Sequence, residues 1–133
     1  MGKPCVAFQL ESASDALKHL YSNSRITTKY GDHFAGNRLH KWEKGERVLF
    51  HCQVCGGYYL LQDSEFYDLD GSCCSDYFPV TGPEEAEDLN RRWDGWKIEK
   101  CFPEKYLFLD EHGSSHWMIQ GREENSRYGQ SWL

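Results

Sequence analysis

The residues with the clearest chemical potential are two cysteines separated by two residues, in the sequence CQVCGG at residues 52–57. A tight turn with this spacing brings both sulfurs to one side, where they can hold a single metal ion. The glycines that follow let the backbone turn back with φ > 0 and direct its N–H groups toward the sulfurs. Because strand-like runs stand on either side, the segment predicts a zinc knuckle at the tip of a β-hairpin.

A tetrahedral zinc site needs two ligands beyond Cys52 and Cys55. Seventeen residues separate Cys55 from Cys73, which suits the usual gap of about 15–20 before a second pair of ligands. We therefore expect the remaining ligands among Cys73, Cys74 and Cys101. The first two are adjacent and their side chains diverge, so we expect one of them to have a different role. A site with four protein ligands would be structural, because it leaves no position for water.

The same residues are compatible with other interpretations. Asp76 or a histidine could supply the fourth ligand, although His51 would point to the opposite face of its strand from Cys52. The six cysteines could also be small buried apolar residues, or the knuckle could have lost its metal. A redox disulfide is disfavoured, because thioredoxin-type motifs begin a helix and this one precedes a strand-like run. Residues 68–71 resemble the start of a calcium loop but lack its closing glutamate.

Composition indicates one globular domain spanning residues 1–133. Hydrophobic residues make up 39% of the chain and aromatic residues 15%, which is too apolar for a disordered protein. A net charge of −6 disfavours a nucleic-acid partner, since such binding depends on Lys and Arg neutralising phosphates.

No apolar run is long enough to span a membrane, and the first ten residues do not resemble a signal peptide. We therefore expect a cytoplasmic protein with reduced thiols.

Periodicity predicts an α+β fold: an antiparallel sheet of about five strands, with two helices packed on one face. The helices are expected at residues 12–22 and 83–93, where apolar residues recur every three or four positions. Strands are expected at residues 47–52, 58–62, 96–102, 106–109 and 116–120. Residues 26–30 and 77–81 are further candidates. Residues 64–77 are expected to form a long polar loop.

The chain from Cys55 to Asn90 carries a series of short motifs. An aromatic strand, Cys-Gly-Gly-Tyr-Tyr-Leu, is followed by Ser-Glu-Phe-Tyr from Ser64, a glycine-containing loop, a short strand and then Pro-Glu-Glu-Ala from Pro83. This order resembles small bacterial immunity proteins of polymorphic toxin systems. The resemblance implies a cytoplasmic, non-catalytic protein that binds and neutralises a toxin made by the same cell.

Acidic residues on the same stretch are the predicted partner-binding groups. They could occupy a basic cleft of the partner and accelerate association by charge. These residues are Glu65, Asp68, Asp70, Glu84, Glu85 and Asp88.

Two other functions are alternatives. The first is a zinc-stabilised domain in transcription or RNA handling, which would need an exposed basic stripe such as Arg38, Lys41, Lys44 and Arg47. The second is a small enzyme with a Cys or His centre, which would need a thiol of low pKa in an exposed cleft.

Overall fold

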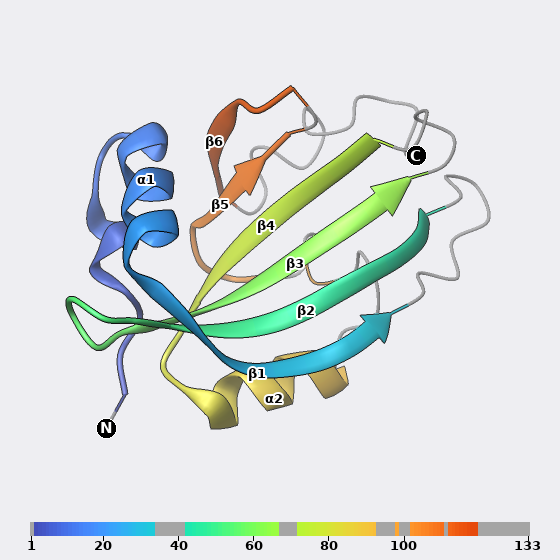
Figure 1. Cartoon of the computed structure of the whole chain (residues 1–133), viewed down its shortest axis with the longest axis horizontal. Coiled ribbons are helices and arrows are strands. Elements are labelled where there is room, and N and C mark those ends of the chain that lie inside the picture. The colour runs from blue at the N-terminus through green and yellow to red at the C-terminus, as the bar shows by residue number, and fades with distance from the viewer. Residues whose placement is uncertain are drawn as a thin grey trace.

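A computed structural model describes residues 2–33, 42–66, 72–92, 98, 102–110 and 112–119 of the chain. Its strands form one antiparallel sheet in the order β1-β2-β3-β4-β5-β6, so that each strand pairs with its neighbours in sequence (Figure 1). The predicted α+β class is confirmed, with six strands where about five were expected. The strands are β1 (Ser24–His33), β2 (Trp42–Cys52), β3 (Tyr58–Phe66), β4 (Ser72–Val80), β5 (Tyr106–Leu109) and β6 (Ser115–Met118).

Two α-helices begin with side chains that satisfy free backbone N–H groups. The Oγ of Ser12 accepts a hydrogen bond from the Asp15 N–H at 3.1 Å, and the Glu85 carboxylate accepts one from the Thr81 N–H at 2.7 Å. Among the described residues, no helix combines the length and the apolar sequence that crossing a lipid bilayer requires. The helical elements are η1 (Val6–Gln9), α1 (Ala13–Asn23) and α2 (Pro83–Arg92).

The helices pack on opposite faces of the sheet, whereas the sequence predicted that both would lie on one face. Leu20 of α1 lies in an apolar cluster with Tyr59 of β3, and Leu89 of α2 lies in a different cluster with Leu60. Because successive side chains of a strand point to opposite faces, these two neighbours on β3 contact different helices. Both faces of the central strands are apolar, so each face needs a cover of its own.

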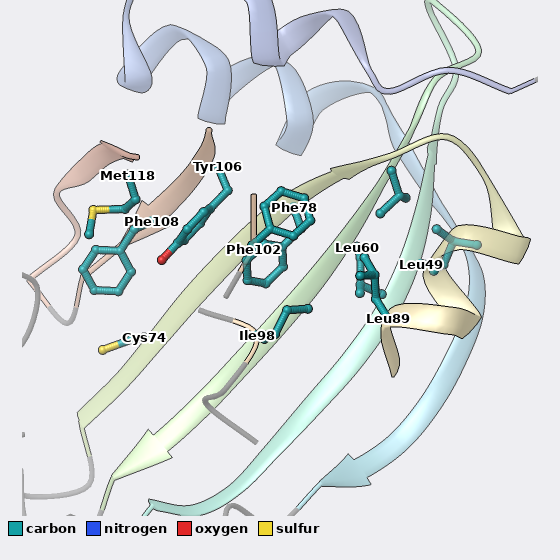
Figure 2. Packing of buried hydrophobic residues seen from close by; sticks show 12 residues of the cluster. Leu49, Leu60, Cys74, Phe78, Leu89, Ile98, Phe102, Tyr106, Phe108 and Met118 are labelled. Carbon is teal, nitrogen blue, oxygen red and sulfur yellow. The ribbon is translucent and has the colours of Figure 1, made fainter. Parts of the chain in front are cut away.

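Aromatic rings fill the core on the α2 face (Figure 2). The ring centroid of Phe78 lies 4.7 Å from that of Tyr106 and 4.9 Å from that of Phe102, which are distances typical of packed aromatic pairs. Cys74 belongs to the same cluster and is buried. Its thiol is therefore on the face of the sheet that α2 covers.

Strands β1 to β4 are longer than the sequence predicted, and most residues in their additional ends are polar. Pairing between β3 and β4 continues from Tyr58 opposite Val80 to Phe66 opposite Ser72. Most of the polar segment 64–77, which was expected to be a loop, is therefore strand. Backbone N–H and C=O groups pair across a sheet whatever side chains the strands carry. Strand ends with polar side chains therefore form, but they lack the apolar pattern by which a strand is predicted from sequence.

The strand predicted at residues 96–102 is wrong where the structure describes that segment. Ile98 has a helical conformation, and the Phe102 N–H donates to the Ile98 carbonyl at 2.9 Å, which is the i to i+4 bond of a helical turn. Both side chains are buried in the cluster on the α2 face. Residues 96–97 and 99–101 lie outside the described residues.

A row of buried polar residues crosses the α2 face of the sheet. Arg47, Gln62 and Asp76 are paired across three neighbouring strands, and each is fully buried. The Arg47 guanidinium donates to Gln62 Oε1 at 2.6 Å and to both the backbone and the side-chain oxygen of Asn90 at 3.2 Å. Arg47 is therefore unavailable for the exposed basic stripe considered above. Asp76, considered as a metal ligand, lies on this face as well.

We predict that Arg47→Ala lowers the free energy of unfolding by about 3 kcal/mol, because it takes the Arg47 donors from the buried Gln62 oxygen and from the partly buried oxygens of Asn90. Urea denaturation measures this change. Arg92→Ala is the matched control, since Arg92 pairs with Asp88 on the exposed surface of α2 and its removal should cost no more than about 0.5 kcal/mol. Equal effects of the two substitutions would contradict the prediction.

Candidate metal centre

Three cysteine thiols meet at the end of the sheet where β2 turns into β3. The Sγ atoms of Cys5, Cys52 and Cys55 all lie within 4.8 Å of one another, and those of Cys5 and Cys55 are 3.8 Å apart. Cys5 and Cys52 are 1% and 0% exposed, and Cys55 is partly buried. Thiolates are preferred ligands of zinc, so this thiol cluster could bind a metal ion.

The turn between β2 and β3, residues 52–57, is called the knuckle below. The Cys52 N–H donates to the Gly57 carbonyl at 2.8 Å, and the Gly56 N–H donates to the Cys52 carbonyl at 3.0 Å. Gly56 has a φ of +76°, which favours glycine because it has no Cβ. The Gly57 N–H donates to the Sγ of Cys55 at 3.3 Å. The hairpin expected from the sequence is therefore present, with a backbone N–H directed at one sulfur.

The N-terminal segment, residues 2–5, brings the third thiol to the knuckle. The Cys5 N–H donates to the Tyr58 carbonyl at 3.1 Å, and the Tyr58 N–H donates to the Lys3 carbonyl at 2.9 Å, so the segment runs beside β3. A Cβ at Gly57 would lie 2.5 Å from the Pro4 carbonyl oxygen and 2.6 Å from the Cα of Cys5. This approach is possible only because residue 57 has no side chain.

The C-terminal end of α1 also contacts the knuckle. The Gln53 N–H donates to the Asn23 carbonyl at 2.6 Å, which ties the end of the helix to the turn. One turn earlier, the Nε2 of His19 lies 3.4 Å from the Sγ of Cys52. Three separate parts of the chain therefore converge on the thiol cluster: the N-terminal segment, α1 and the hairpin.

The thiols of the cluster differ in acidity. Burial raises the pKa of Cys5 to about 12, and the neighbouring Cys52 thiol adds to the effect. Burial also opposes ionisation of Cys55, but the N–H groups of Val6 and Gly57 donate to its sulfur. Together with the adjacent thiols, these donors hold the pKa of Cys55 below that of an ordinary thiol. The thiolate, the form that binds metal, therefore forms more readily at Cys55 than at Cys5.

The structure brings together two of the five cysteines predicted as ligands, Cys52 and Cys55. Cys74 lies apart from them in the apolar cluster on the α2 face (Figure 2). The side chain of Cys73 and all of Cys101 lie outside the described part of the structure.

Sequence reasoning missed Cys5 and did not consider His19. Cys5 is separated from Cys52 by 46 residues and belongs to no spacing motif. His19 lies within a helix with an ordinary amphipathic sequence, so nothing in that segment indicates a metal ligand. The signal that could have indicated a third chain segment at the knuckle was Gly57. A glycine within a strand-like run often marks the close approach of another backbone.

The histidines considered in the sequence have local structural contacts. His51 stacks on the ring of Tyr58, and its Nε2 lies 3.2 Å from the Gly56 carbonyl oxygen. In the turn between β5 and β6, the Asp110 carboxylate lies 2.9 Å from the Nε2 of His116 and accepts the backbone N–H of His112. The carboxylate thus organises the hairpin turn between β5 and β6.

Three of the predicted partner-binding carboxylates are described, all on α2. Glu84 is exposed in the first turn. Glu85 accepts hydrogen bonds from Thr81, and Asp88 forms ion pairs with Arg91 and Arg92, so these two carboxylates have partners within the chain. The other three side chains lie outside the described residues: Glu65, Asp68 and Asp70.

Comparison of the chain with known protein families, with curated proteins and with solved structures finds no match.

We predict that Gly57→Ala detaches the N-terminal segment, because the new Cβ cannot fit against Pro4 and Cys5. The expected loss is about 2–3 kcal/mol of unfolding free energy, with loss of hydrogen-exchange protection at the Cys5 and Tyr58 amides. Gly56→Ala is the control: nothing lies within 4 Å of its Cβ, so only the positive φ penalises it, by about 1 kcal/mol. Retained protection in Gly57→Ala would contradict the prediction.

Proposed function

We propose that the protein is a non-catalytic, protein-binding domain of the immunity type, stabilised by one structural zinc ion. The zinc in this proposal rests on the thiol cluster at the knuckle, and the protein-binding role rests on the acidic charge and on the resemblance of residues 55–90. A metal enclosed by protein ligands has no open position at which to activate water, so it serves the fold. Thiolates suit zinc, and zinc has no redox chemistry that would oxidise them.

Zinc at this position would join parts of the chain that are far apart in sequence. Cys5 reaches the knuckle from the N-terminal segment, and 46 residues separate it from Cys52. Cross-linking a loop of this length restricts the unfolded chain far more than it restricts the folded one. Because the unfolded chain holds no preformed site, the free energy of zinc binding would stabilise the folded state directly.

We predict that the purified protein contains one zinc ion per chain and that chelation lowers its melting temperature by about 10 °C or more. Cys5→Ala should lose the zinc and the chelator response. Cys74→Ala is the matched control, because Cys74 is equally buried but lies on the α2 face. Elemental analysis and thermal melts with and without chelator measure both effects. A metal-free native protein, or loss of zinc from both variants, would overturn this part of the proposal.

The end of the molecule around the knuckle has the features of a protein-binding surface. Val54 at the tip is 67% exposed, and Val6, whose N–H donates to Cys55, is 36% exposed. The first turn of α2 lies at the same end of the sheet, because Tyr58 pairs with Val80 three residues before the helix begins, and it presents Glu84. Exposed apolar side chains with a polar rim are typical of contact surfaces. We call Val6, Val54 and Glu84 the knuckle surface.

A basic protein is the partner that this surface fits. The chain carries a net charge of −6, which would attract a positively charged partner over a distance and increase the association rate. The resemblance of residues 55–90 to immunity proteins supports a toxin made by the same cell as that partner. In such a cell the domain would act in the cytoplasm, where its thiols stay reduced.

We predict that the product of a neighbouring toxin gene binds the purified protein and that co-expression relieves its toxicity. Glu84→Gln should slow association several-fold at low salt and much less at high salt, because it removes long-range attraction. Val54→Asn should accelerate dissociation at least about tenfold, because it removes an apolar side chain that the partner would bury in the complex. Surface-based kinetic measurements at two salt concentrations separate the two effects.

Ser114→Lys is the control for charge, since it changes the net charge by the same amount as Glu84→Gln. It lies in the exposed turn between β5 and β6, at the opposite end of the sheet from the knuckle. Its association rate should stay much closer to that of the unmodified protein. If no neighbouring gene product binds at either salt concentration, the immunity function is refuted.

A further inference from the structure

His19 is the side chain that could complete the coordination of the thiol cluster. Its Nε2 lies 3.4 Å from the Sγ of Cys52, and the imidazole is half-buried on the side of α1 that faces the knuckle. Leu20, the next residue, is fully buried in the cluster on the same face of the sheet. The histidine is therefore held near the thiols by the packing of the helix that carries it.

Two distances at the site match those of a tetrahedral metal centre. With Zn–S bonds of about 2.3 Å and Zn–N bonds of about 2.0 Å, tetrahedral angles place two sulfurs about 3.8 Å apart and a sulfur and a nitrogen about 3.5 Å apart. The Cys5 and Cys55 sulfurs are 3.8 Å apart, and the Cys52 sulfur is 3.4 Å from the His19 nitrogen. Two opposite edges of the expected tetrahedron are thus already present.

The remaining edges require the imidazole to move and the thiols to adjust their separations. The three sulfurs are mutually within 4.8 Å, but His19 lies farther than this from at least one of them. A rotation of its side chain can close this gap, because the ring is not fully buried. The end of α1 is already tied to the knuckle, since the Asn23 carbonyl accepts the Gln53 N–H.

We propose that Cys5, Cys52, Cys55 and His19 form a Cys₃His zinc site, with His19 as the fourth ligand. The proposal rests on the structural zinc of the proposed function and adds the residue that closes the coordination shell. The ion then joins the N-terminal segment, α1 and the β2–β3 hairpin at one point. A fourth protein ligand excludes water from the metal, which makes the site structural and not catalytic.

Zinc affinity, measured by competition with a coloured chelator, tests the role of His19. We expect His19→Ala to weaken zinc binding at least about 100-fold, because the loss of a direct ligand should exceed the 10- to 100-fold effect of losing an outer-shell partner. Alanine favours helix, so α1 should remain folded, and circular dichroism checks this. Lys18→Ala, the exposed neighbour on the same helix, should bind zinc as the unmodified protein does.

Cobalt substitution identifies the ligand itself. The Co²⁺-loaded protein should show the absorption of a tetrahedral site with three sulfurs and one nitrogen. In Co²⁺-loaded His19→Ala that spectrum should change, and added imidazole should restore it. If the unmodified protein binds no zinc, the proposed structural zinc fails. If it binds one zinc ion and His19→Ala keeps the same affinity and cobalt spectrum, the zinc stands and the assignment of His19 is refuted.

Discussion

The N-terminal segment lies directly against the backbone of the β2–β3 hairpin, with no side chain between them at Gly57. This contact places Cys5 beside Cys52 and Cys55, and the other features of the site depend on it. Two glycines in sequence perform different tasks here: Gly56 adopts a positive φ to turn the chain, and Gly57 removes the Cβ that would block the segment. A metal ion could then stabilise an arrangement that the backbone contact has already formed.

The two faces of the sheet separate two kinds of polar chemistry. The face covered by α1 carries the thiol cluster, and the face covered by α2 carries the buried row of Arg47, Gln62 and Asp76. Strand alternation enforces this division, because neighbouring residues on one strand cannot contact the same helix. Cys74 shares the face of Asp76, two residues away, and for that reason does not reach the knuckle.

Residues with a local signal were predicted well. The knuckle follows from the cysteine spacing and the glycines, and each α-helix follows from its apolar stripe and its cap. The polar ends of β3 and β4 were taken for a loop, because a sheet can accommodate polar residues wherever backbone pairing continues. Ile98 and Phe102 were assigned to a strand, yet their spacing of four also fits one face of a helical turn, and short apolar runs cannot distinguish the two.

The sequence by itself determined the α+β class, the hairpin tip and the pair of thiols that it presents, since each depends on residues close together in the chain. The tertiary structure decided that α1 and α2 cover opposite faces, that Cys5 and His19 lie beside the knuckle and that Cys74 does not. These placements depend on contacts between distant segments: the register of the sheet, the packing of Leu20 and the backbone approach at Gly57. No spacing within the chain encodes them, because the residues that meet are separated by tens of positions.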